Sequence, residues 1–220
     1  MKILPKTSIC LIIANGMLAS CTAADPTAYT GLASAQHLKA NPGDRTGRVP
    51  YRYDGGANFR QYDKVIVDPV TVYRGQDNQF VKVSEQDKTA LAIYMQSQFT
   101  QKLRTRFSVV NSPSMGTLRV HLTLTGAKTT TPVLGPFSHL DVGGGVYNAV
   151  QAVRDKEGSM TGSVAYAVEI YDAMTKTLLS AYVTKQYPNA MNVGASFGAL
   201  KASQVAIDKG ADALLAQLRP

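Results

Sequence analysis

The sequence predicts an α+β fold, in which a single, mostly antiparallel sheet carries two amphipathic helices packed on one face. Apolar and polar residues alternate over 117–130, the spacing of a strand with one buried side. Two more alternating stretches, 160–171 and 178–187, flank a short turn, as in a hairpin. Two further stretches repeat apolar residues every three or four positions. Such elements bury their apolar sides best as one layer of helices on one sheet.

The strands follow from valine-rich and alternating stretches. The first is expected over 62–73, with an edge position or a bulge at Pro69, which cannot donate to a strand ladder. A short strand is expected over 107–110. In the long strand 117–130, one face is apolar: Leu118, Val120, Leu122 and Leu124. In the hairpin, we expect one shared apolar face: Val164, Tyr166, Val168 and Ile170 on the first strand, with Leu179, Ala181 and Val183 on the second.

Two long helices are expected. The first opens at Ser84, whose hydroxyl can cap the first turn together with Asp87. Its apolar stripe recurs every four residues: Leu91, Met95, Phe99 and Leu103. The second helix is expected over 197–218. A short helical run is also expected over 147–153, after a loop over 131–145 that ends in three glycines.

Residues 22–58 show no sustained period, and turn-forming Gly, Pro, Asn and Asp recur in them. We interpret this segment as a tether, which would span roughly 35 Å if it were flexible. The alternative is that Tyr51 and Tyr53 dock the segment on the domain.

The first twenty residues have the organisation of an export signal. Lys2 and Lys6 supply positive charge, and a short apolar run follows over 8–17. That run is too short for a permanent membrane span, which needs about 20 residues.

The tetrapeptide that follows, Leu18-Ala19-Ser20-Cys21, resembles the processing motif of bacterial lipoproteins. The resemblance implies that signal peptidase recognises Leu18, Ala19 and Ser20, and that Cys21 becomes the N-terminus with a diacylglyceryl thioether and an N-acyl chain. Thr22, in place of an Asp, implies an anchor in the outer membrane with the domain facing the periplasm. The alternative is a secreted protein with a free Cys21 thiol.

The chain thus divides into a signal peptide (1–20), a lipidated N-terminus and tether (21–58), and a single domain (59–220). Loss of the signal lowers the net charge from +8 to about +6 and leaves Cys21 as the sole cysteine. A disulfide or a thiolate metal cluster within the chain is therefore excluded. This positive net charge is consistent with an ordinary soluble surface. It is also consistent with an anionic partner, such as lipid headgroups or cell-wall polymer. No basic block is dense enough to predict nucleic-acid binding.

Candidate catalytic residues are few. His139 and Asp141 lie two residues apart in the glycine-rich loop, with Ser138 and Glu157 near them in sequence. No nucleophile elbow accompanies them, and the glycines lack the spacing of a phosphate-binding loop. His121 falls on the polar side of its strand with no second ligand two residues away, so we expect it to be solvated rather than metal-bound.

Three segments of the chain resemble the bacterial lipoproteins grouped as domain of unknown function 3313: residues 47–53 (Gly-Arg-Val-Pro-Tyr-Arg-Tyr), 65–70 (Val-Ile-Val-Asp-Pro-Val) and 185–190 (Lys-Gln-Tyr-Pro-Asn-Ala). The resemblance implies an exported protein whose domain covers nearly all of the mature chain. It carries no catalytic residues across to this chain, and we predict no cofactor.

The function that these observations favour is a non-enzymatic lipoprotein of the outer membrane that binds an envelope protein or cell-wall polymer. One alternative is an envelope hydrolase that uses His139 and Asp141. The other is a subunit of a self-assembling scaffold. The sequence does not set the oligomeric state.

Overall fold

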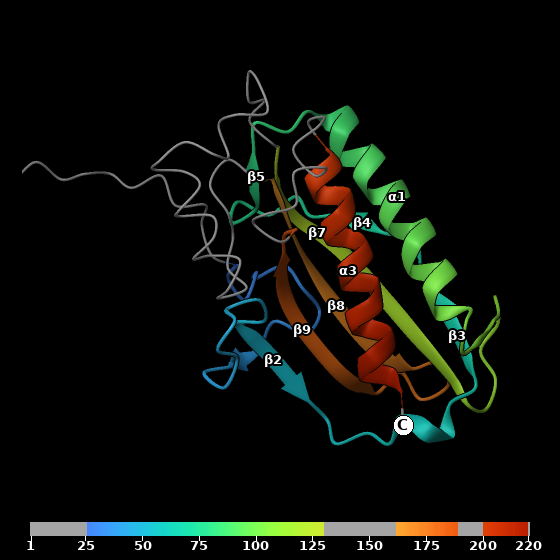
Figure 1. The fold of residues 1–220 in the computed structure, drawn as a ribbon. Coiled ribbons are helices and arrows are strands. Elements are labelled where there is room, and N and C mark those ends of the chain that lie inside the picture. Colours follow the sequence, from blue (N-terminus) through green and yellow to red (C-terminus); the bar gives the residue numbers. More distant parts are fainter. Residues whose placement is uncertain (1–25, 130–161, 189–199, 220) are drawn as a thin grey trace, which may run out of the picture.

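The computed structural model describes residues 26–129, 162–188 and 200–219. They form one mixed, mostly antiparallel sheet of nine strands, with two α-helices and one 3₁₀ turn (Figure 1). The elements, in chain order, are β1 (Lys39–Ala40), β2 (Tyr51–Asp54), η1 (Phe59–Gln61), β3 (Lys64–Val67), β4 (Thr71–Val72), β5 (Gln79–Val81), α1 (Glu85–Leu103), β6 (Ser108–Val109), β7 (Thr117–Lys128), β8 (Ser163–Asp172), β9 (Leu178–Gln186) and α3 (Lys201–Leu218).

The long strand β7 lies in the middle of the sheet. It pairs antiparallel with β8, and β8 pairs antiparallel with β9, so the predicted hairpin is confirmed. The predicted alternation of β7 is confirmed as well, because its four apolar residues are all buried in the principal hydrophobic cluster: Leu118, Val120, Leu122 and Leu124. We call this the larger cluster.

The strands that pair with β7 on the side away from β8 differ from the prediction. Instead of one strand over 62–73, the short strands β3, β4 and β5 run parallel to β7, one after another. Pro69 lies in the break between β3 and β4, where it removes a backbone donor. The next backbone N–H, that of Val70, donates to the Gln96 side chain of α1 at 2.9 Å. A proline therefore ends the ladder, and a helix residue satisfies the neighbouring amide.

Helix α1 begins as predicted. The Ser84 hydroxyl accepts the Asp87 backbone N–H at 3.0 Å and lies 2.8 Å from the Asp87 carboxylate. The expected apolar stripe is buried in the larger cluster: Leu91, Met95, Phe99 and Leu103. Helix α3 supplies Ile207 and Leu214 to the same cluster. The two helices lie side by side along the strands (Figure 1).

From residue 26 on, the segment interpreted as a tether is part of the folded body. Strand β2 pairs with β9, which places Tyr51 opposite Val183 and Tyr53 opposite Ala181. Tyr29 and Leu32 are buried with Tyr73 and Val183 in a second cluster, which we call the smaller cluster. Residue 59 therefore does not separate a tether from a domain. Residues 26–58 instead follow the alternative expectation, in which this segment docks on the domain.

The two clusters occupy opposite faces of the sheet, since successive residues of a strand point to opposite sides. On β8, Tyr166 and Val168 belong to the larger cluster, while Ala167 between them belongs to the smaller one. The buried Glu169 side chain accepts the Ser34 backbone N–H at 2.6 Å on the face of the smaller cluster. The N-terminal segment thus covers part of the face that the larger cluster leaves free.

Candidate functional site

The residues singled out in the sequence for lipidation and for catalysis fall outside the described residues. Leu18, Ala19, Ser20 and Cys21 precede residue 26, and Ser138, His139, Asp141 and Glu157 lie within 130–161. The lipid anchor and the hydrolase set therefore stay predictions. The expected helix over 147–153 is also outside the described residues.

The structure instead draws attention to β9, because its register differs from the predicted one. A bulge between Ile170 and Tyr171 shifts the pairing, so that Val168 lies opposite Tyr182 and Tyr166 opposite Thr184. The prediction that Ala181 and Val183 share a face with Tyr166 is therefore wrong. They point to the face of the smaller cluster, and polar residues of β9 face α3: Ser180, Tyr182, Thr184 and Gln186.

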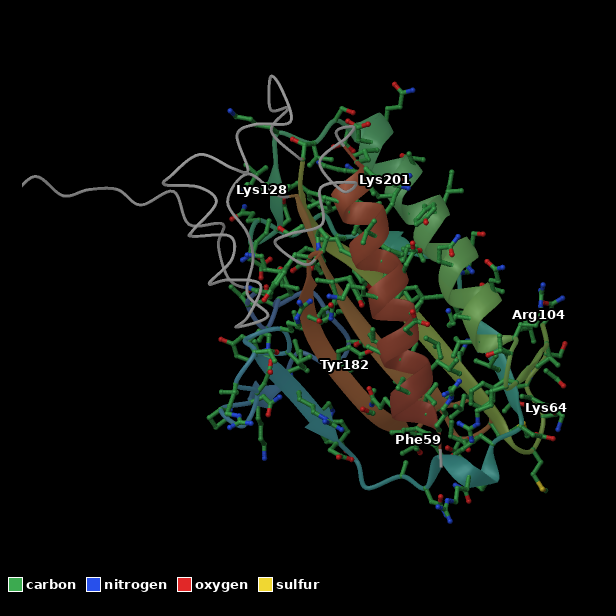
Figure 2. The ribbon with its side chains drawn as sticks, in the orientation of Figure 1. Phe59, Lys64, Arg104, Lys128, Tyr182 and Lys201 are labelled. Atoms are coloured by element: carbon green, nitrogen blue, oxygen red, sulfur yellow. The ribbon has the colours of Figure 1, made fainter. Side chains whose placement is uncertain are left out.

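Three of these residues, Tyr182, Thr184 and Gln186, line a cavity of about 510 Å³ beside α3, which we call the tyrosine cavity. Its walls come from the loop over 41–49, from β2, β8 and β9, and from the second half of α3. The lining residues are Asn41, Gly43, Asp44, Val49, Arg52, Tyr166, Tyr182, Thr184, Gln186, Ala213 and Gln217. Figure 2 shows Tyr182 on β9 beside α3.

Two tyrosines, Tyr166 and Tyr182, line the cavity. Tyr166 is fully buried, and its ring meets the ring of Phe99 edge-on at 5.7 Å. Its hydroxyl lies against Gly210, where a β-carbon would overlap it. Burial raises the pKa of Tyr166 and of Tyr182 well above the usual value for tyrosine, so both hydroxyls stay protonated and can donate hydrogen bonds.

The outer wall is held in place by hydrogen bonds within the loop. Asp44 accepts the backbone N–H of Thr46 at 2.9 Å, and Asn41 donates from its side chain to the Val49 carbonyl at 2.9 Å. Arg48, 8% exposed, donates to the Gln186 side chain at 2.9 Å and stacks over the Tyr187 ring at 4.0 Å. These contacts hold the loop that forms the outer wall of the cavity.

Arg52 is half-exposed and adds a positive charge to the cavity lining. Its guanidinium lies 3.4 Å from the Asp54 carboxylate. Gln217 donates to the Ser180 hydroxyl at 3.2 Å from the α3 side. Hydroxyl, amide and guanidinium groups thus converge on one space. Such a set can bind a polar ligand through several hydrogen bonds, and it contains no nucleophile with an adjacent base.

A second polar group, on the other face, joins β3 to β7. The Arg119 guanidinium donates to both carboxylate oxygens of Asp68, at 2.9 and 3.0 Å. His121 Nε2 lies 2.7 Å from the same carboxylate, and its ring packs against Tyr171. His121 is 43% exposed but bound to Asp68, which corrects the expectation of a merely solvated histidine.

A shallow cleft of about 230 Å³ adjoins this group. Burial, and then the charge of Glu169, raise the pKa of Tyr171 to about 12, so its hydroxyl is neutral at ordinary pH. The Asp68 carboxylate is already shared between two donors, so it is poorly placed to act as a base. We interpret the group as a brace between strands.

Among the described residues, no three His, Cys, Asp or Glu side chains are close enough to hold a metal ion. Over the same ranges, neither helix combines the length and the hydropathy required to cross a bilayer.

The family profile of DUF3313, described as a protein of unknown function, matches residues 28–214. The chain belongs to the DUF3313 family. The match begins close to Tyr29, so for this DUF3313 protein the N-terminal segment that packs on the sheet is part of the family domain. A comparison with curated proteins gives no significant match.

Several solved structures are distantly similar to this DUF3313 protein. A PelC dodecamer from Paraburkholderia phytofirmans is 11% identical, with a TM-score of 0.37, and the alignment covers 72% of this chain and 89% of that one. The hypothetical protein CT253 from Chlamydia trachomatis is 8% identical, with a TM-score of 0.33 and coverage of 71% and 93%. Protein XCC0632 from Xanthomonas campestris, of family DUF330, is 5% identical, with a TM-score of 0.31 and coverage of 71% and 81%.

Sequence reasoning missed the tyrosine cavity of this DUF3313 protein. Its lining comes from five separate segments, so no local spacing reveals it. One signal was present: Ser180, Thr184 and Gln186 are polar at every second position around Tyr182, apart from the more apolar set of Leu179, Ala181 and Val183. A polar face on a central strand indicates a cavity or a ligand as readily as it indicates solvent.

Proposed function

We propose that this protein is a non-enzymatic lipoprotein of the bacterial outer membrane that binds cell-wall polymer in the tyrosine cavity. The observation that supports binding is that two tyrosines, the side-chain amides of Asn41, Gln186 and Gln217, and Arg52 line one space of about 510 Å³. Glycan strands and their peptides present hydroxyl, amide and carboxylate groups, which such a lining complements. A segment of an envelope protein is the other ligand with this chemistry.

The anchor in this proposal is Cys21, which carries a diacylglyceryl thioether and, once cleavage behind Leu18-Ala19-Ser20 frees its amine, an N-acyl chain. The body of the protein then faces the periplasm. We also infer that α1 and α3 cover one face of the sheet together, because the larger cluster joins Phe99 and Leu214 to the apolar side of β7. The tyrosine cavity lies beside α3, over β9 and β2.

Binding is tested by sedimentation of a lipid-free chain, starting at Thr22, with isolated cell-wall sacculi. We expect the wild-type chain to sediment with the sacculi and Arg52→Ala to sediment several-fold less. Arg74→Ala is the matched control, since Arg74 is an exposed arginine outside the cavity, paired with Glu85 at 2.8 Å. Equal retention of both variants would exclude the cavity, and no retention of the wild type would exclude the polymer.

The anchor is tested separately, by mass spectrometry of the protein from native membranes. We expect an N-terminal Cys21 that carries the mass of a diacylglyceryl group and an acyl chain. A Cys21→Ala variant should lose this mass. A native N-terminus elsewhere, without acyl mass, would rule out the anchor.

A further inference from the structure

We propose that the protein stands with one defined end of its sheet against the bilayer: the end formed by β5 and the last residues of β7. This inference rests on the proposed lipid anchor at Cys21. It adds an orientation, and it assigns an anionic lipid surface as the partner of that end, which we call the β5 end.

The first step is the reach of the chain. Pro26 is buried, and only five peptide units separate it from Cys21. Five residues span at most about 18 Å when fully extended. The acylated residue therefore cannot lie farther than this from the point where the chain joins the body.

The second step is where that point lies. The Tyr29 hydroxyl donates to the Gln79 side chain of β5 at 3.1 Å, and the Thr30 backbone N–H donates to Asp77 at 3.0 Å. The Gly31 backbone N–H donates to the Tyr73 hydroxyl at 3.0 Å. The entry of the chain is thus fixed beside β5 by three hydrogen bonds, with Tyr29 only 1% exposed.

The third step is the length of the body. Gln79 lies opposite Gly126 and Val81 opposite Lys128, so β5 adjoins the last residues of β7. A strand of twelve residues, as β7 is, spans about 36–40 Å. Lys64, opposite Thr117 at the start of β7, therefore lies far from the anchor. Figure 2 shows Lys128 and Lys201 at one end of the molecule, and Lys64 and Arg104 at the other.

The fourth step is the charge of the β5 end. Lys82 is exposed beside Val81, which is 46% exposed, and among the described residues neither Lys82 nor Lys128 has a carboxylate partner. The acidic groups that the structure describes at this end already have partners: Asp77 has Tyr73 and Thr30, Glu85 has Arg74 and Lys88, and Asp87 has the Ser84 hydroxyl. Lysines without a carboxylate partner in the described part of the chain, next to an exposed apolar side chain, suit an anionic headgroup layer.

The test uses the full chain, processed and acylated, in vesicles of phosphatidylethanolamine and phosphatidylglycerol that carry an acceptor dye on a lipid headgroup. Acylation consumes the Cys21 thiol, so an introduced cysteine is the single labelling site. Val81→Cys marks the β5 end, and Met115→Cys, at a position 88% exposed, marks the opposite end. We expect energy transfer to be several-fold higher from position 81. Equal transfer, or higher transfer from position 115, would overturn the orientation.

A second variant tests the short reach itself. A flexible insert of fifteen Gly and Ser residues between Cys21 and Pro26 should remove the difference between the two positions. A difference that persists would contradict the reach argument. Flotation of the vesicles is read first: protein that fails to float shows that the anchor proposal has failed, whereas floating protein without a difference shows that only the orientation has failed.

Discussion

The two faces of the sheet are covered in different ways. On one face, regular elements with repeated spacing meet, and Phe99, Leu122 and Leu214 are all essentially inaccessible in the larger cluster. On the other face, a segment with little regular structure is held at a few points, chiefly Tyr29 and Leu32. On the first face, many buried residues share the contacts, whereas the second face depends on a few buried residues. The comparison teaches that a segment without a period can still belong to the folded body.

The largest effect is expected from Phe99→Ala in the larger cluster. Phe99 is fully buried and packs against Tyr166, so its truncation removes apolar contact and leaves a cavity. We expect the free energy of unfolding to fall by about 3–5 kcal/mol, measured by urea denaturation of the lipid-free chain. Ile93→Ala, on the same helix but 66% exposed, is the control and should change little. A loss at Phe99 as small as at Ile93 would deny that the larger cluster dominates stability.

A smaller and more local effect is expected from Tyr29→Ala in the smaller cluster. The variant loses the ring contact with Tyr73 and the hydrogen bond to Gln79. We expect a loss of about 1–3 kcal/mol, together with faster amide hydrogen exchange in residues 29–38 but not in α1. Uniformly faster exchange across both faces would show that the two regions unfold as one unit. This result would contradict the view that the two faces are stabilised in different ways.

Alkaline pH should also destabilise the smaller cluster, through ionisation of Tyr29. Burial raises the pKa of Tyr29 to about 12, whereas in the unfolded chain it is near 10. Folding keeps this proton bound, so the stabilisation is complete below pH 10 and is lost as the pH rises toward 12. Relative to Tyr29→Phe, which cannot ionise, the wild type should lose up to about 2–3 kcal/mol between pH 10 and 12. Denaturation curves of both proteins at several pH values measure the difference, and a constant difference would contradict the burial argument.

Gly210→Ala should destabilise the protein, although alanine normally favours a helix. A β-carbon at this position overlaps the Tyr166 hydroxyl, which is buried and cannot move freely. We expect a loss of about 1–3 kcal/mol from overpacking. Adding Tyr166→Phe should recover part of it, since the hydroxyl is the atom in conflict. A double-mutant cycle with no coupling between the two positions would refute this contact.

The smallest effect is expected from Asp68→Asn in the brace between β3 and β7. The variant weakens the contacts with Arg119 and His121, both of which are partly exposed. Solvent screens such pairs, so the loss in unfolding free energy should stay below about 1 kcal/mol. A loss as large as that of Phe99→Ala would mean that this face depends on charge rather than on the Tyr29 anchor.

The parts of the fold that the sequence predicted are those with a local period or a local cap. Leu118 to Leu124 alternate, Leu91 to Leu103 recur every four residues, and Ser84 with Asp87 marks a helix start. Each of these signals arises within one element and is physically tied to its conformation. They gave β7, α1 and the hairpin of β8 and β9 correctly.

The parts that the sequence did not predict depend on pairing between distant residues. The parallel placement of β3, β4 and β5 along β7 leaves no local period, because each strand is only two to four residues long. A single bulge at Ile170 and Tyr171 exchanges the residues that β9 turns to each face of the sheet, so that Tyr182 lies opposite Val168. The sequence pattern therefore did not predict the tyrosine cavity. The docking of Tyr29 depends on partners more than 40 residues away, at Tyr73 and Gln79.

Among the described residues, the sheet ends at β1 on one side and at β6, β4 and β5 on the other, and none of these border strands has more than three residues. Such short borders offer another chain few unpaired backbone groups to join. Copies crowded on one membrane, as lipid anchors would hold them, therefore have little means of merging their sheets into a continuous one. If the described body self-associates, we expect side chains rather than strand pairing to form the contacts.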